Sequence, residues 1–138
     1  GECGISFLAT TQLATLYGHD FPGSLHGAPM LIPGETSMVR GRLMRWFGEQ
    51  QLQPRIVGEF DDSALMKAFG QSGIGVFIAP SVIADEVRHQ YGVEVIGQTD
   101  EVKELFYAIS VERRLNHPAV AAVTSAARQA LFARADKL

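Results

Sequence analysis

Four carboxylates stand in two short stretches of the sequence, at Glu35 and at Glu59, Asp61 and Asp62. Carboxylate oxygens are the ligands that hard cations prefer, so a cation site would form if the bends that carry Glu35 and Asp61 converge. A plainer interpretation is available, because acids at a helix start are ordinary partners of the helix dipole and Glu59 can point out of a strand. We favour the plainer interpretation, assign no metal ligand, and keep the cation site as the alternative.

Two hydroxyl side chains, Thr36 and Ser37, precede the apolar residues of a predicted helix. Free N–H groups at a helix start attract an anion or a polar oxygen, so this turn is a candidate ligand contact. Hydroxyls also cap helices by accepting those same N–H groups. Capping alone is the interpretation that we favour, and it is compatible with ligand binding.

Patterns for enzyme chemistry are missing from the sequence. The histidines show no metal-ligand spacing with one another or with Cys3, and they are His19, His26, His89 and His117. No Gly-x-Ser-x-Gly nucleophile elbow or paired acid and base occurs. The glycines of residues 73–75 have a helix before them and a strand after, which is the reverse of a dinucleotide fingerprint. We therefore expect no enzyme activity and no cofactor.

Composition limits the function further. The chain has 138 residues, of which 46% are hydrophobic and 20% charged, and this is a globular composition. A nucleic-acid binder usually has a basic excess, whereas the net charge here is -3, so the chain itself is not expected to grip DNA. The single cysteine, Cys3, excludes an internal disulfide and favours the cytoplasm. No apolar run approaches the ~20 residues that cross a bilayer, so no membrane contact is expected.

These candidate residues sit between alternating short strands and helices. The predicted strands cover residues 5–9, 30–32, 55–60, 74–79, 93–96 and 103–111, and the predicted helices cover residues 11–17, 36–50, 61–71, 81–91 and 118–134. Short apolar strands separated by helices predict an α/β fold whose parallel strands are covered on both faces.

Periodicity also predicts which helix faces turn inward. In the helix over 36–50, the apolar residues at i, i+4, i+7 and i+8 form one face: Val39, Leu43, Trp46 and Phe47. In the next helix Leu65, Ala68 and Phe69 share a face. Gly73 and Gly92 end two helices, because glycine adopts the left-handed conformation that a helix end favours.

Three segments in order carry a resemblance to a known family. They are residues 55–62 (RIVGEFDD), 65–69 (LMKAF) and 73–80 (GIGVFIAP). This order resembles the effector-binding region of LysR-type transcription regulators. Residues 60–65 and 106–114 are similar in particular to sodium-responsive activators of that family.

The resemblance implies a periplasmic-binding-protein-like (type 2) effector subdomain with a mixed, mainly parallel sheet flanked by helices. Residues 1–9 would form a crossing strand, residues 10–101 the second effector subdomain, residues 102–111 the return crossing strand, and residues 112–138 a C-terminal helix of the first subdomain. The chain starts without Met, close to an apolar strand, so we expect a fragment that lacks the DNA-binding domain.

In such regulators the effector lies in a cleft, one wall of which is formed by the crossing strand and by loops at strand ends. The resemblance places these residues on that wall: Ser6, Phe7, Thr10, Gly34, Thr36, Ser37, Asp61 and Asp62. The location agrees with open α/β sheets in general, where ligands collect beyond the carboxyl ends of the strands.

The expected function is therefore an effector-binding and oligomerisation region that acts when cleft closure shifts the geometry of an oligomer. Its expected partners are a small-molecule or ion effector and further copies of itself, with DNA reached only through the missing N-terminal domain. A periplasmic-type solute-binding domain is the alternative. A small α/β enzyme is a third class, which the missing acid, base and nucleophile patterns disfavour.

Overall fold

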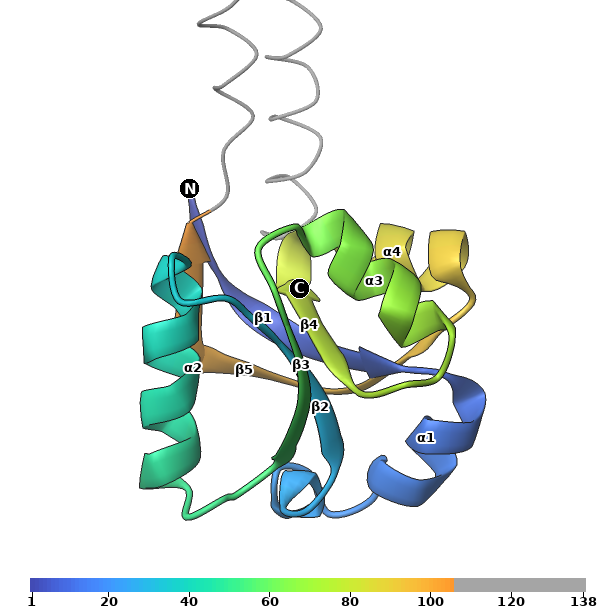
Figure 1. Cartoon of the computed structure of the whole chain (residues 1–138), viewed down its shortest axis with the longest axis horizontal. Helices are drawn as coiled ribbons and strands as arrows, with labels where there is room; N and C mark the ends of the chain where they lie inside the picture. Colours follow the sequence, from blue (N-terminus) through green and yellow to red (C-terminus); the bar gives the residue numbers. More distant parts are fainter. Residues whose placement is uncertain (106–138) are drawn as a thin grey trace, which may run out of the picture.

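The computed structural model describes residues 1–105, which form one α/β unit (Figure 1). Its strands are β1 (Glu2–Ala9), β2 (Pro29–Pro33), β3 (Arg55–Phe60), β4 (Phe77–Pro80) and β5 (Glu94–Leu105). Its helices are α1 (Thr11–Tyr17), α2 (Met38–Glu49), α3 (Ser63–Gln71) and α4 (Ala84–Tyr91), with short 3-10 turns at Gly23–Leu25 and Ser81–Ile83. The helix predicted over residues 118–134 lies outside the described residues.

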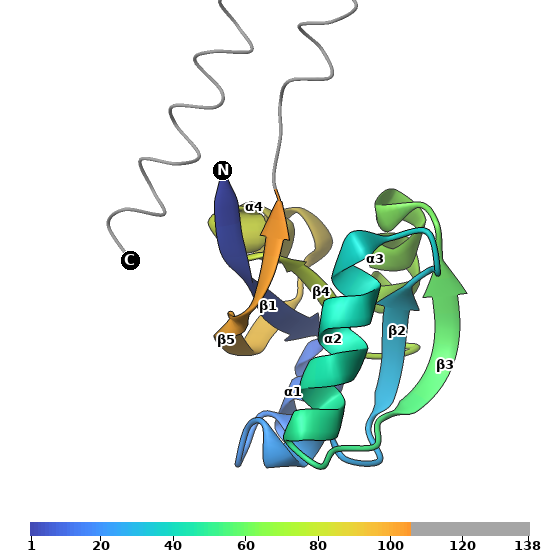
Figure 2. The same cartoon turned by 90° about the vertical axis from the view of Figure 1, so that its left-hand side faces the viewer.

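The strands form a mixed sheet, as predicted. β1 pairs antiparallel with both β4 and β5, while β2 and β3 pair parallel. The parallel bridge between Met30 and Val76 joins the two sets, and its backbone bonds measure 2.8 Å from Leu31 N to Val76 O and 2.9 Å from Val76 N to Pro29 O. The order is β3-β2-β4-β1-β5, and of these strands only β1 runs against the others (Figure 2).

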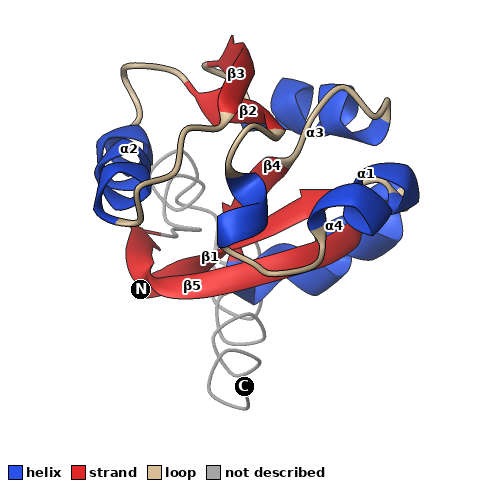
Figure 3. Ribbon diagram, turned by 90° about the horizontal axis from the view of Figure 1, so that it is seen from below, coloured by secondary structure: helices blue, strands red, loops and turns tan. Residues whose placement is uncertain are grey.

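Helices cover both sides of these strands. Figure 1 shows α2 on one side and α1, α3 and α4 on the other, and Figure 3 shows the same layers from below. The centre of the sheet is inaccessible to solvent, since Ile5, Phe7 and Leu8 of β1 are fully buried. A strand buried on both faces reads as a continuous apolar run rather than an alternation, which is why β1 could be predicted.

Helix α2 supplies the largest part of one layer, and its predicted inward face is confirmed. Val39, Leu43, Trp46 and Phe47 are all buried. The Trp46 ring stacks on Phe7, with 5.7 Å between ring centroids, and therefore fastens the helix to the central strand.

Two predicted strand boundaries are wrong. The strands expected over 93–96 and 103–111 are a single strand as far as the structure describes them, because β5 continues from Glu94 to Leu105. Its polar middle, with Gln98 and Asp100, resembles a loop, yet β5 borders the sheet and can expose such residues while it pairs with β1. The strand expected over 74–79 begins only at Phe77, since Ile74 lies in an exposed turn.

The inward face of α3 is also different from the prediction. Leu65 and Phe69 are 49% and 39% exposed, whereas Met66 and Gly70 are buried. Gly70 decides this orientation, because a Cβ at that position would collide with the ring of Phe77, so the helix approaches β4 closely. The predicted left-handed helix ends are confirmed by φ values of 84° at Gly73 and 64° at Gly92.

Both ends of the described part lie together. Glu2 pairs with Leu105 at the end of the β1–β5 ladder, so the first and last described residues lie side by side at one end of these strands. None of the helices within residues 1–105 has the length and apolar character needed to span a membrane.

Candidate functional site

A cavity of about 280 Å³ opens at the carboxyl ends of the parallel strands. Pro33, Phe60 and Pro80, the last residues of β2, β3 and β4, line it. Figure 2 shows the arrowheads of β2 and β3 at this end of the molecule. In open α/β sheets, ligands bind in the crevice outside the carboxyl ends of the strands, so this position suits a ligand.

The two bends that carry the predicted acids do converge at this cavity. The Gly34 N–H donates to the Phe60 carbonyl over 2.8 Å, which joins the chain after β2 to the end of β3. The Asp61 carboxylate lies against Gly34 so closely that a Cβ there would collide with it. Asp61 also lines the cavity. Glycine at position 34 thus lets the carboxylate pack beside the backbone.

The four predicted acids do not act together. Glu59 forms an ion pair with Arg40, and Asp62 caps α3 by accepting the Ala64 N–H over 2.8 Å. Glu35 is exposed. Within residues 1–105 no group of three or more His, Cys, Asp or Glu side chains is arranged to hold a metal ion. The plainer interpretation is therefore confirmed for Asp62, which stands at the start of α3.

The hydroxyls before α2 have separate positions. Ser37 is the N-cap residue of α2 and lines the cavity, but its side chain makes no capping bond. The predicted side-chain cap is therefore wrong for Ser37. Its backbone N–H closes the preceding turn by donating to the Gly34 carbonyl over 3.0 Å. Ser37 lines the same cavity as Asp61. Thr36 is exposed outside the lining.

Three predicted effector contacts on or beside β1 are not among the residues that line this cavity. Phe7 is fully buried between Phe21 and Trp46, and Ser6 is buried with its hydroxyl 3.0 Å from that of Ser81. Thr10 caps α1 at the opposite end of the sheet, since β1 runs antiparallel to its neighbours. Their contact with an effector stays a prediction.

Two charged residues of the cavity were missed, Lys67 on α3 and Glu104 on β5. Burial raises the pKa of the Glu104 carboxyl, and the nearby Lys67 ammonium partly opposes that shift. One carboxylate oxygen, Oε2, is buried and accepts no hydrogen bond from any residue that the structure describes. The sequence carries little signal for either residue, because Glu104 reaches the cavity only through the pairing of β5 with β1.

Contacts from α2 hold the end of β5 in place. Arg42 Nη1 donates to the Lys103 carbonyl over 2.6 Å, directly before Glu104. Trp46 Nε1 donates to Glu101 Oε2 over 2.7 Å. Because these bonds join α2 to β5 on either side of Val102, they fix the backbone that presents Glu104 to the cavity.

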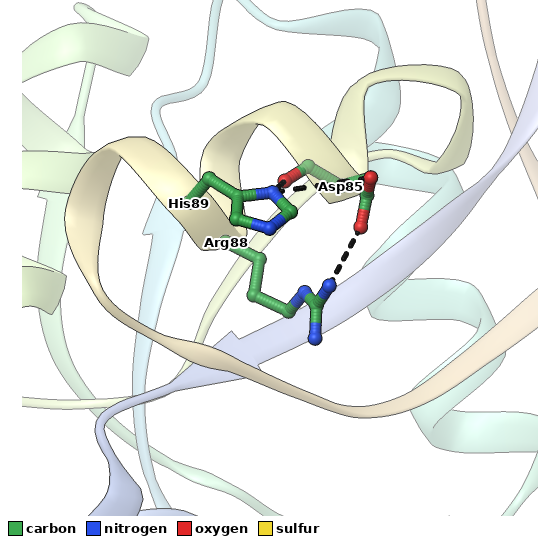
Figure 4. Close-up of polar contacts among 3 residues, drawn as sticks. All are labelled: Asp85, Arg88 and His89. Atoms are coloured by element: carbon green, nitrogen blue, oxygen red, sulfur yellow. Dashed lines mark hydrogen bonds and ion pairs between the residues drawn. The ribbon is translucent and has the colours of Figure 1, made fainter.

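Three polar side chains of α4, outside the cavity, form contacts within that helix. On α4, Asp85 accepts from Arg88 Nη2 over 2.9 Å, and His89 Nδ1 donates to the Asp85 carbonyl over 2.8 Å (Figure 4). All three side chains are exposed, and this spacing is typical of pairs that stabilise one helix. Cys3 is buried, and burial raises the pKa of its thiol, which agrees with a structural role.

Comparison with known proteins gives one family. The sequence matches the family model described as "LysR substrate binding domain" over residues 10–132. It is 41% identical over 135 residues to the transcriptional activator protein NhaR of Escherichia coli, an alignment that covers 98% of this chain and 44% of that protein. NhaR of Shigella flexneri gives the same values. The chain therefore spans less than half the length of the curated relatives that it matches.

Solved structures show the same fold. The AmpR effector binding domain of Citrobacter freundii matches with a TM-score of 0.57 and 19% identity, over 98% of this chain and 65% of that one. The regulatory domain of HypT from Salmonella typhimurium matches with a TM-score of 0.57 and 15% identity, over 75% of this chain and 48% of that one. The resemblance inferred from the residues is confirmed, and nothing in these comparisons favours the periplasmic solute-binding alternative. The chain belongs to the LysR substrate-binding domain family.

Proposed function

We propose that this chain is the effector-binding and oligomerisation region of a transcriptional activator that responds to sodium and controls ion-homeostasis genes. The observation that carries the proposal is the cavity at the carboxyl ends of β2, β3 and β4, in a chain that matches the family over residues 10–132. The 41% identity to NhaR supports activation as the direction of control.

The effector contacts that we propose follow from the lining of the cavity. Ser37 offers a hydroxyl without a capping bond, and Asp61 offers a carboxylate beside it. Gly34 contributes space, because any side chain there would displace Asp61. Thr36 and Asp62 stand next to these residues in sequence and form the edge of the proposed site.

Partners and location complete the proposal. A net charge of -3 disfavours direct contact with phosphates, so DNA binding belongs to a part of the polypeptide outside this chain. Copies of the region assemble with one another, and effector binding shifts the balance between their arrangements. A regulator of transcription of this family acts in the cytoplasm, which a chain with a single cysteine fits.

A reporter assay tests this proposal. The complete polypeptide that carries this chain is expressed with a reporter gene behind its own target promoter, and transcription is measured with added NaCl or with KCl at equal ionic strength. NaCl alone should activate the reporter, by roughly fivefold or more as is typical of allosteric coupling. Ser37→Val and Asp61→Asn should each weaken activation, whereas Asp100→Asn, whose carboxylate is 89% exposed, should leave it unchanged. Equal responses to both salts, or unaltered responses in both cavity variants, would contradict the proposal.

A further inference from the structure

The cavity carries opposite charges on two of its walls. Lys67 projects from α3, and Glu104 projects from β5. They are close enough for Lys67 to stabilise the ionised Glu104 carboxylate. They are not joined by an ion pair, however, so a gap separates the ammonium from the carboxylate.

Each of these charges lacks a full set of partners. Glu104 Oε2 is buried without a donor among the described residues. A buried carboxylate without a donor destabilises the protein, because it has lost hydration and gained no hydrogen bond. Lys67 likewise has no carboxylate within ion-pair distance in residues 1–105. A ligand that donates to Glu104 and accepts from Lys67 would satisfy both groups.

We propose that the Lys67 and Glu104 side of this cavity binds a small zwitterion, with its ammonium group at Glu104 and its carboxylate group at Lys67. The inference rests on the proposed function and adds an organic co-effector to it, beside the sodium response that is proposed to act through Ser37 and Asp61. A bare metal cation fits the Lys67 and Glu104 side poorly, because it would meet the Lys67 ammonium. A simple anion fits poorly too, because Glu104 and Asp61 would repel it.

The size and lining of the cavity agree with this class. A volume of about 280 Å³ holds roughly nine non-hydrogen atoms, if each takes about the 30 Å³ of one water molecule. That is the size of a common amino acid. Apolar side chains also line the cavity, among them Val39, Met66 and Ile78, and they can contact the carbon atoms that separate the two ends of the ligand.

Thermal shift and calorimetry on the complete polypeptide test the inference. The probes are the common amino acids and the ω-amino acids of two to six carbons, and each zwitterion that binds is compared with its own amine and its own carboxylate. For 4-aminobutyrate these are butylamine and butyrate. We expect at least one zwitterion to bind about tenfold more tightly than either analogue, because each analogue leaves one charge unsatisfied.

Variants locate the two ends of the ligand. Glu104→Gln and Lys67→Met should each weaken binding of the zwitterion about tenfold. Lys67→Gln repeats the second test with a polar side chain, which suits a partly exposed position. Glu104→Gln should reduce the preference for the zwitterion over its carboxylate analogue. Lys67→Met should reduce the preference for the zwitterion over its amine analogue. Lys103→Met and Asp100→Asn remove the same charges outside the cavity and should change affinity less than about twofold.

The possible outcomes separate this inference from the proposed function. No zwitterion binding, equal binding of the single-charge analogues, or unchanged binding in Glu104→Gln and both Lys67 variants would overturn the inference. Stabilisation of the polypeptide by NaCl would also overturn the inference if Glu104→Gln abolishes that stabilisation and Lys67→Met strengthens it. The reporter would still respond to NaCl through Ser37 and Asp61 in these cases, so the proposed function would stand.

Discussion

Replacement of Phe7 by leucine separates two roles for this residue. The family resemblance predicts that Phe7 contacts the effector, whereas the structure buries its ring completely, 5.3 Å from Phe21 and 5.7 Å from Trp46 between ring centroids. If the packing role is the main one, Phe7→Leu should lower the stability of the chain. Effector affinity should then be nearly unchanged under conditions in which the variant is folded.

The expected size of the effect follows from these contacts. Aromatic pairs contribute about 0.5–1.5 kcal/mol each, so the loss of both pairs costs about 1–3 kcal/mol. Phe7→Ala would add a cavity and cost about 3–5 kcal/mol. That is a large part of the roughly 5–15 kcal/mol by which a domain is stable, so leucine is the safer variant. With a urea m-value near 2 kcal/mol/M, the midpoint should fall by roughly 1 M.

Trp46 is the single tryptophan of the chain and stacks directly on Phe7, so its fluorescence reports urea unfolding of this cluster. Leu16→Ala, at a position that is 68% exposed, is the control and should shift the free energy of unfolding by less than about 0.5 kcal/mol. An unchanged urea midpoint together with weakened effector binding in Phe7→Leu would contradict this packing role, because Phe7 would then act on the ligand and not in the core.

Three further predictions concern the cavity and its edge. Burial raises the pKa of Glu104 in the folded chain, so its contribution to stability is present below the unfolded pKa of about 4.3 and is lost as pH rises through the folded pKa. Glu104→Gln should therefore be more stable than the parent at neutral pH, and urea midpoints measured against pH should show the difference closing toward pH ~4. Asp62→Ala should cost about 1 kcal/mol of stability in urea unfolding, since it removes the α3 cap, and Asp62→Asn should retain most of it. Gly34→Ala should displace the Asp61 carboxylate and reduce reporter activation, while Gly41→Ala, where a Cβ meets no neighbour, should leave activation intact.

The sequence predicts those parts of the fold that depend on local periodicity. All four apolar residues chosen for α2 are buried, because a helix that packs on one side must repeat its apolar residues near the helical period. The ends at Gly73 and Gly92 were predictable for a similar reason, since few residues other than glycine adopt positive φ without strain. The cavity edge was predictable as well, because Asp61 directly follows β3 and Ser37 follows β2 after a turn of three residues.

Pairing between distant strands was not predictable from local patterns. Thr10 and Ser37 both follow a strand closely, yet they lie at opposite ends of the sheet, because β1 runs against β2. Alternation of apolar and polar residues states that a strand exists and does not state its direction. The continuous β5 was missed for the same reason, since only its ladder with β1 shows that its polar middle is a strand.

The position of Glu104 links the cavity to the rest of the polypeptide. Glu104 is the residue before Leu105, where the described chain leaves beside Glu2, and Arg42 holds the preceding Lys103 carbonyl over 2.6 Å. A ligand bound to Glu104 and Lys67 therefore connects α3 to the one strand that leads out of the described part. Ligand binding can shift an oligomer only by favouring one of its arrangements. We expect a ligand held by Glu104 to have such an effect through β5, because β5 is the strand at which the described part of the chain ends. By this argument, Arg42→Met should weaken reporter activation more than it weakens zwitterion affinity, since it loosens the end of β5 that presents Glu104 but removes no group from the cavity lining.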